Sequence, residues 1–491
     1  MASFEMVMSD GTTRSYLDAL YDEIIGDDDN TGLPNTESGW ATSWEVSADG
    51  LTWTIKGRDT IAFHDGHIVD SGDVKFGIDR MLAEGYRGTG GTSVKREVDS
   101  METPDPNTFI AHLKAKAIFW HASALTAGNG SSPTYIIPAH YIGEVGEGVA
   151  NKTPLGSGPY KAVVVAVNER IEYEAVEKHW FLGTPNVKTL NYLVIPEEST
   201  RVALLRTGGV DIATIGKGSG DTVRDAGLQV FNRTTSGFGA YRIEEQFKES
   251  YEGYGPNPFA DIRVRRALDW YAIDRQVMVD IFLFGLGTPT MSYPIGPTDP
   301  AYVPLPIPQY DPDRARALLA EAGWGDGFEI DFIIVPRPAI PEGEEIAEAM
   351  AGWYEDLGIT VNRVPTQYSA FRAQLLGEGF TRPTVFGVWQ LGTRSVSGAR
   401  IGARHDPGAG FANSYDLKMA DLAHAWQEVN NVEEYITAGR AYQQEWYDQV
   451  GTSVLFLTGE VFGASSKIPS DWNVRARPYS FNLEGAGGYT K

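Results

Sequence analysis

The sequence predicts an α/β fold spread over more than one domain. Helix-like and strand-like patterns alternate through its middle third, and such alternation is typical of sheets covered by helices. The chain has 491 residues, and at roughly 100–200 residues a domain this length predicts about two to four domains. Hydrophobic residues make up 42% of the chain and charged residues 22%, which indicates folded cores rather than disorder.

The first third of the chain is expected to be rich in β-strands. Apolar and polar side chains alternate along Leu51–Lys56, as in an antiparallel strand with one buried face. A helix capped by Asp73 is expected to run to Leu82. Further along, the pattern predicts a hairpin of residues 161–167 and 169–176, strands at 189–195 and 210–215, and a short helix at 199–207.

The middle third predicts a strand–helix–strand unit that follows a well-marked helix. Asp311 and Pro312 fit the cap and the first turn of that helix. Strands are expected at 328–335 and 359–364, with a helix between them around 346–357. A crossover of this kind is right-handed if the two strands are parallel.

A third strand of this region, Thr384–Trp389, leads into a long loop. The loop, 390–412, holds five glycines and three arginines. Ligands of open α/β sheets bind beyond the carboxyl ends of strands, so this loop is where we expect a site. Helical patterns resume at 416–427 and 433–449, and a final strand is expected at 452–457.

The composition excludes several classes of protein. Lys and Arg number 41 against 65 Asp and Glu, and the formal net charge of −24 argues against a nucleic-acid partner. The absence of cysteine excludes disulfides, thiol nucleophiles, thiolate metal sites and a lipid-anchoring cysteine within this chain. No apolar run approaches the roughly 18 residues of a membrane span. Because Met1–Phe4 does not open an export signal, we expect such a segment to be absent or already removed.

Enzyme and metal motifs are missing from the sequence. It has no Gly-x-Ser-x-Gly elbow, no dinucleotide or P-loop glycine pattern and no His-Glu-x-x-His, which disfavours a hydrolase, a nucleotide-binding protein and a zinc protease. The His-Asp-Gly-His run at 64–67 is interpreted as a turn, and His405-Asp406 as ordinary loop residues, rather than as metal ligands. The acidic runs 27–29 and 342–348 are interpreted as solvated loop and helix N-terminal charge. We therefore expect no catalytic residue, no metal and no cofactor.

Spaced segments along nearly the whole chain resemble one known family. They occur in this order: 41–55, 58–59, 63–66, 73–76, 136–140, 154–160, 204–212, 259–268, 272–275, 310–324 and 413–422. Together they resemble the bacterial family 5 extracellular solute-binding proteins, the dipeptide-, oligopeptide- and nickel-binding class of ABC importer receptors. Most of this signature is expected to be scaffold, since Asp49-Gly50, for example, fits a hairpin turn.

The resemblance implies a two-lobed periplasmic-binding-protein fold (type II, cluster C-like) with an extra β-rich subdomain. Such lobes close over a solute about a hinge. In this sequence, the expected parts are lobe one at 1–41, 155–236 and 457–491, the inserted subdomain at 42–154, and lobe two at 237–456.

The resemblance also points to the solute. Peptide-binding members typically hold the α-amine of the peptide with an aspartate a few residues after a tryptophan of lobe two. Here Trp389 is followed by no carboxylate until Asp406, and a buried ammonium without a counter-charge is costly. We therefore expect a small organic, acid-bearing solute stacked on Trp389 and paired with Arg394, Arg400 or Arg404. The alternative for each arginine is a solvated loop charge.

Phe238 and Tyr241, in the segment that enters the hinge, are the candidates on the facing side. The alternative is that both rings pack inside the first lobe.

The leading function is a monomeric receptor of an ABC importer, at the periplasmic or extracellular face of the cytoplasmic membrane. Its expected partners are a small-molecule solute or peptide and the permease subunits. A peptide-binding receptor, chaperone or signalling receptor on the same scaffold remains an alternative, and a hydrolase is a disfavoured one.

Overall fold

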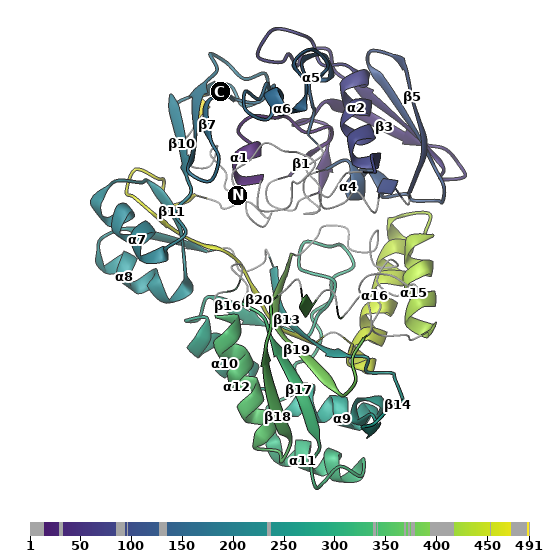
Figure 1. The fold of residues 1–491 in the computed structure, drawn as a ribbon. Helices are drawn as coiled ribbons and strands as arrows, with labels where there is room; N and C mark the ends of the chain where they lie inside the picture. The colour runs from purple at the N-terminus through teal and green to yellow at the C-terminus, as the bar shows by residue number, and fades with distance from the viewer. Residues whose placement is uncertain are drawn as a thin grey trace.

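The structure is a computed structural model that consists of two bodies joined by extended strands (Figure 1). The upper body in Figure 1 holds the N-terminal part of the chain, and the lower body holds the middle part together with the last two long helices. The residues described are 14–28, 33–84, 94–95, 97–126, 135–232, 237–336, 340, 342–367, 370–371, 374, 379–392, 417–451, 453–472 and 489–490. No helix within these ranges combines the length and the apolar character that crossing a membrane requires.

An antiparallel four-stranded sheet forms the β-rich part of the upper body. Its strand order is β3-β4-β6-β5, and the strands span Ala41–Val46 (β3), Thr52–Gly57 (β4), Thr108–Leu113 (β6) and Val98–Asp105 (β5). Helix α2 (Ser71–Leu82) packs on this sheet through side chains such as Val74 and Ile78. The predicted strand and helix are both present.

The predicted cap of α2 was wrong. Asp70, not Asp73, is the N-cap, and its Oδ1 accepts hydrogen bonds from the backbone N–H groups of Gly72 and Asp73. Asp73 stands three residues further on, and its carboxylate accepts the N–H of Asp70. The two acids stand at the two ends of a capping box, and the sequence analysis assigned the cap to the second of them.

Two three-stranded sheets also belong to the upper body. The predicted hairpin is present as β7 (Tyr160–Ala166) and β8 (Arg170–Ala175), and β10 (Thr189–Leu193) pairs with β8. The second small sheet has the order β11-β21-β12 and the bounds Ile212–Ile215, Val461–Ala464 and Gln229–Asn232. Helices α7 (Glu198–Thr207) and α8 (Gly220–Asp225) cover it.

The short helices of the upper body are α1 (Arg14–Leu17), α4 (Trp120–Ala124), α5 (Ala139–Val145) and α6 (Glu147–Ala150).

A mixed six-stranded sheet is the centre of the lower body. Its order is β16-β20-β13-β19-β17-β18, with bounds Gly287–Pro289, Ser453–Thr458, Gly237–Glu244, Thr384–Gly392, Glu329–Ile334 and Thr360–Pro365. Strand β17 is parallel to both β18 and β19, and the predicted strand–helix–strand unit is therefore of the parallel kind. The strand predicted at 384–389 is real but extends three residues further, to Gly392.

Helices cover both faces of this sheet. Alternate residues of β17 point to opposite sides, since Phe332 belongs to one apolar cluster and Ile333 to the other. The first cluster contains side chains of α9 (Ile262–Arg266), α10 (Arg275–Phe282), α11 (Pro312–Glu321) and α12 (Gly343–Glu355). The second contains side chains of α15 (Leu417–Gln427) and α16 (Val432–Gln449).

The predicted cap of α11 is confirmed, because the carboxylate of Asp311 accepts the N–H of Arg314.

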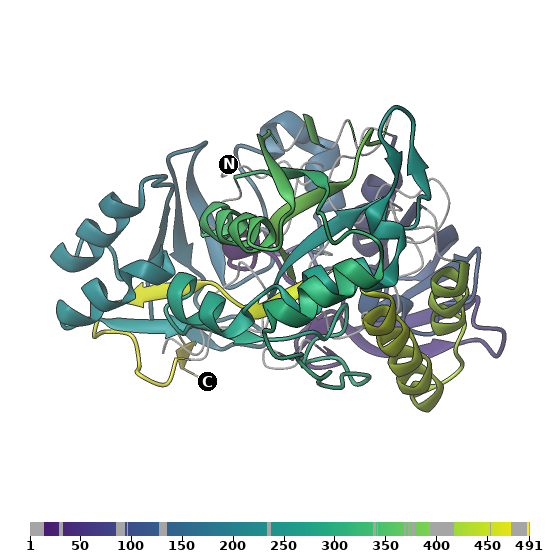
Figure 2. The same cartoon turned by 90° about the horizontal axis from the view of Figure 1, so that it is seen from below.

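The chain crosses between the two bodies at two adjacent places. Strand β12 pairs with β21 in the upper body, and the next strand, β13, belongs to the lower sheet. Strand β20 pairs with β13, and the chain then returns through residues 459–460 into β21. Figure 2, seen from below, shows these last strands in yellow, running from one body into the other. Because β12 pairs with β21 and β13 pairs with β20, the two connections lie close together, which supports the predicted hinge, although the lobe boundaries at 236/237 and 456/457 stay predictions.

Candidate functional site

The edge of the six-stranded sheet beside the two crossings is the candidate site. Strand β13 begins there at Gly237, which pairs with Gly392 of β19 on one side and with Thr458 of β20 on the other. Strands β17 and β19 are parallel, so both carboxyl ends lie at this edge, where open α/β sheets bind ligands. We call this the crossing edge and define it as residues 237–240, 389–392 and 456–458.

The crossing edge is tightly packed around Gly239. A Cβ added at this glycine would lie 2.1 Å from Cε2 of Phe456, which is far closer than two carbons can approach. Phe456 itself is fully buried on the neighbouring strand. The glycine is thus required so that the Phe456 ring can cover β13, and this contact holds the start of β13 against the end of β20.

The structure places one predicted solute residue on the crossing edge. Trp389 lies in β19 and pairs with Ala240 of β13, although its side chain is outside what the structure describes. Arg394, Arg400 and Arg404 lie outside the described residues, just after the end of β19. A role for these four side chains in solute binding stays a prediction.

The two predicted residues of the facing side are on β13 and point into the lower body. Phe238 is 1% exposed and meets Tyr293 edge to face, with ring centroids 5.7 Å apart. Tyr241 is fully buried in the cluster on the other side of the sheet. Both rings therefore pack in the interior, in the lower body rather than the upper one. Their contact with a solute stays a prediction.

A buried polar network fixes β13 and β20 beneath the crossing edge. The hydroxyl of Tyr241 donates to Oδ1 of Asp269 at 2.9 Å, and Arg275 donates to the same oxygen at 2.6 Å. Arg275 also donates to the backbone carbonyl of Val454 in β20 at 3.0 Å. Burial raises the pKa of Tyr241 well above its ordinary value, so its hydroxyl keeps its proton and donates. The sequence pattern did not reveal this network, because Tyr241 and Asp269 lie far apart in the chain.

A second contact between the bodies lies near the crossings. Lys217 of the upper body has its Nζ 3.5 Å from Oε2 of Glu342, at the start of α12, and both side chains are largely buried. The interpretation of the acidic runs as solvated charge is therefore wrong for Glu342, and also for Asp27, which is buried. It is confirmed for Glu344 and Glu345, which are exposed in the first turn of α12. Glu342 differs because the opposite body brings a cation against it.

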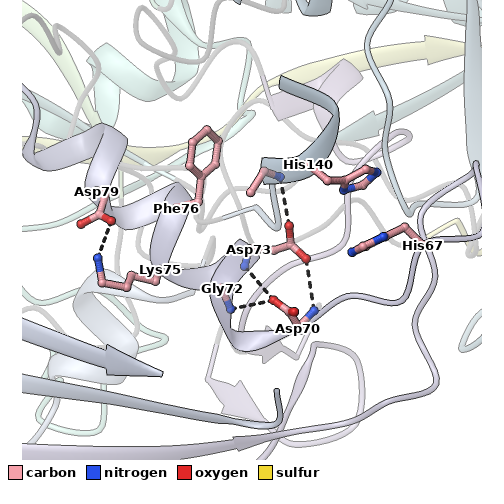
Figure 3. Close-up of a pocket in the computed structure, with 9 residues that line it drawn as sticks. His67, Asp70, Gly72, Asp73, Lys75, Phe76, Asp79 and His140 are labelled. Carbon is pink, nitrogen blue, oxygen red and sulfur yellow. Dashed lines mark hydrogen bonds and ion pairs between the residues drawn. The ribbon is translucent and has the colours of Figure 1, made fainter. Parts of the chain in front are cut away.

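An open hollow of about 370 Å³ lies on the upper body beside the start of α2 (Figure 3). The rings of His67 and His140 stack there, with centroids 4.0 Å apart. Asp73 accepts the backbone N–H of Ala139, which begins α5, and burial raises the pKa of this carboxyl. Asp70 and Asp73 thus serve as helix caps, while Asp79 pairs with Lys75 of the same helix.

The predicted turn at 64–67 is confirmed. The N–H of Gly66 donates to the carbonyl of Phe63, and Gly66 has a φ of +93°. His64 donates from its Nε2 to the carbonyl of Gly158 at 2.8 Å, which ties the turn to the neighbouring segment. Within the described ranges, no three His, Asp or Glu side chains are arranged to hold a metal ion.

Comparison with known proteins agrees with the fold. The family model for the bacterial extracellular solute-binding proteins, family 5 Middle, matches residues 35–385. The chain is 28% identical over 390 residues to heme-binding protein A of Haemophilus influenzae and 27% identical over 383 residues to oligopeptide-binding protein AppA of Bacillus subtilis. These matches cover 72% and 73% of this chain, and 66% of the length of each relative.

A solved structure shows the same architecture. The periplasmic binding protein AgaA from A. tumefaciens R10, in complex with agropinic acid, superposes with a TM-score of 0.75 over 98% of this chain and 94% of that one, at 19% identity. The predicted two-lobed α/β fold is thereby confirmed.

Proposed function

Because the chain belongs to the bacterial extracellular solute-binding proteins, family 5, we propose that it is the solute-binding receptor of an ABC importer. It closes on a small organic solute and delivers that solute to a membrane permease. The observation that carries this proposal is the pair of adjacent crossings, which join two bodies at the sheet edge where the carboxyl ends of β17 and β19 lie. A hinge beside the crossing edge suits a protein that binds its solute by closing the two bodies over it.

The proposed solute is a small organic acid that stacks on Trp389 and pairs with one or more of Arg394, Arg400 and Arg404. Guanidinium groups bind carboxylates in a bidentate manner, and no carboxylate follows Trp389 before Asp406 to hold the amine of a peptide. The agropinic acid held by AgaA supports an organic acid on this fold. The name of the AppA relative favours a peptide as the second candidate.

The proposed setting follows from the family. The receptor acts as a monomer at the periplasmic or extracellular face of the cytoplasmic membrane, its partners are the permease subunits, and it catalyses no reaction. Family 5 proteins are described as extracellular and solute-binding, which supports the proposed location and the binding of a solute.

A panel of compounds tests this proposal. Purified protein is mixed with organic acids including opines, with short peptides, with sugars and with nickel, and thermal unfolding is followed. A compound present at 100 times its Kd stabilises the fold by about 2.7 kcal/mol through linkage of binding to folding. We expect an organic acid to raise the unfolding temperature, and no turnover of that acid.

The site is tested with the same acid. Combined Trp389→Ala and Arg394→Ala substitutions are expected to raise its Kd by about tenfold to a hundredfold, since a charge-assisted hydrogen bond contributes about 1.5–3 kcal/mol. Arg224→Ala is the matched control, because Arg224 is exposed on α8 and pairs only locally with Asp221. Unchanged affinity in the double variant would show that the site lies elsewhere. A panel without any stabilising compound would count against the receptor itself.

A further inference from the structure

The turn that leads into α4 contacts the lower body on the side away from the crossings. Figures 1 and 2 both show α15 and α16 lying against the β-rich part of the upper body, while the crossing strands lie on the opposite side. Phe119 of the upper body meets Tyr435 of α16 edge to face, with centroids 4.7 Å apart. Ala122 of α4 is 1% exposed and belongs to the same apolar cluster as Tyr435 and Trp426 of the lower body. The two bodies therefore share a buried apolar contact here.

Neighbouring side chains hold Phe119 in place. The next residue, Trp120, is fully buried in the core of its own body, with its ring 6.2 Å from that of Trp53. Ile118 and Phe119 face the other way and are partly buried against the lower body. The core of the upper body thus fixes the segment that carries Phe119, so the ring is already oriented when the two bodies meet.

A polar contact lies beside the two rings. The ammonium of Lys116 donates to the side-chain oxygen of Asn430, between α15 and α16. Asn430 in turn donates from its backbone N–H and from its side-chain amide to Oε2 of Glu434, each at 2.7 Å. Those hydrogen bonds and, to a smaller degree, the charge of Lys116 hold the pKa of Glu434 below its ordinary value. A cation of the upper body therefore faces an acceptor and a carboxylate of the lower body.

The position of this contact decides what it does. When two bodies turn about a hinge, contacts near the hinge move little and contacts far from it separate first. Lys217 follows β11, which pairs with the crossing strand β21, and its partner Glu342 begins α12. Tyr435, the partner of Phe119, lies on α16, on the opposite side of the molecule in Figure 1. Opening of the lobes must break the Phe119 contact.

We propose that Lys116, Phe119, Asn430 and Tyr435 form a clasp that keeps a closed population of the protein in the absence of solute. This inference rests on the proposed function, since it assumes that the bodies open and close. The clasp sets the fraction of binding-competent molecules and thereby the apparent affinity for the solute. Through the clasp, the inserted β-rich subdomain docks on α15 and α16.

The experiment measures the separation of the two bodies without any added solute. The chain contains no cysteine, so two substitutions give two unique spin-label sites. They are Ser43→Cys on β3 and Asp313→Cys on α11, and both side chains are exposed. Pulsed electron spin resonance then gives the distribution of label separations. We expect the wild-type background to show a population at the separation of the structure, beside a longer one.

Variants distinguish the clasp from general damage. Phe119→Ala is expected to lower the ratio of the short to the long separation by about tenfold, the usual scale for a buried aromatic at a contact. Phe181→Ala, which removes an exposed aromatic elsewhere on the upper body, should keep the ratio. Unfolding temperatures of the same samples check that each variant is folded.

Two results would overturn the proposal: an unchanged ratio in folded Phe119→Ala, or a wild-type distribution with the long separation only. Because no solute is present, neither result tests the receptor function. A failed search for a solute, in turn, does not contradict the clasp.

Discussion

Acid is expected to destabilise the β-rich part of the upper body through His121. The ring of this residue on α4 lies 4.8 Å from that of Trp53 and 5.0 Å from that of Trp44, measured between centroids. Its Nδ1 is buried and has no hydrogen-bond partner within the described ranges. Burial lowers the pKa of His121 from 6.5 to about 3, so the folded protein holds a neutral imidazole throughout the mildly acidic range.

The sign of the effect follows from the two pKa values. The unfolded chain takes up a proton near pH 6.5 and the folded chain only near pH 3, so the unfolded state binds more protons between these values. Stability contributed by the neutral ring is present above pH 6.5 and is lost as the pH falls toward 3. At 1.36 kcal/mol per pH unit, lowering the pH from 7 to 5 reduces the free energy of unfolding by at most about 2 kcal/mol. The reduction is about 1 kcal/mol when solvent screens half of the effect at this partly exposed ring.

Urea unfolding at pH 7 and pH 5 measures this loss. His121→Phe keeps an aromatic ring between the two tryptophans but cannot titrate, so the free energy of unfolding should fall by about 1–2 kcal/mol less than in the wild type. His112→Gln is the control, because His112 is partly exposed and bonded to Glu102 on the sheet surface. If wild type and His121→Phe lose the same free energy between the two pH values, the buried neutral imidazole is refuted.

Two further pairs of substitutions test the packing beneath the candidate site. Gly239→Ala places a methyl 2.1 Å from the Phe456 ring, and overpacking of this kind costs about 1–3 kcal/mol, so thermal unfolding should occur earlier. Gly253→Ala, at a glycine with open space around its Cβ position, reports the cost of backbone strain alone and should be milder. Arg275→Met leaves the carboxylate of Asp269 buried without its cation and should cost about 3–5 kcal/mol, whereas Tyr241→Phe removes one hydrogen bond and should cost about 1 kcal/mol. Equal losses in Arg275→Met and Tyr241→Phe, measured by urea unfolding, would contradict the central role of this ion pair.

The sequence predicted most of the lower body because its signals are local. Asp311 with Pro312 marks a helix start, and alternating apolar residues mark β17, so both elements lie where the pattern puts them. The cap of α2 was misassigned because a capping box has acids at both ends of its first turn.

Features that depend on distant residues were not predictable in the same way. The crossing from β20 into β21 is defined by pairing with strands more than 200 residues earlier in the chain. The charge of Glu342 is buried only because Lys217 comes from the other body. The candidate site falls between these cases, since β19 places Trp389 on the crossing edge while the arginines that follow stay predictions from the sequence.

Native mass spectrometry of the purified protein tests the central claim most directly. The receptor function requires that wild-type protein retain, or take up from the compound panel, one small organic molecule per chain. We expect a single mass increment corresponding to an organic acid, and we expect it to be lost when Trp389→Ala and Arg394→Ala are combined, while Arg224→Ala retains it. A chain that shows no increment with any compound of the panel would contradict a receptor that closes on a small solute.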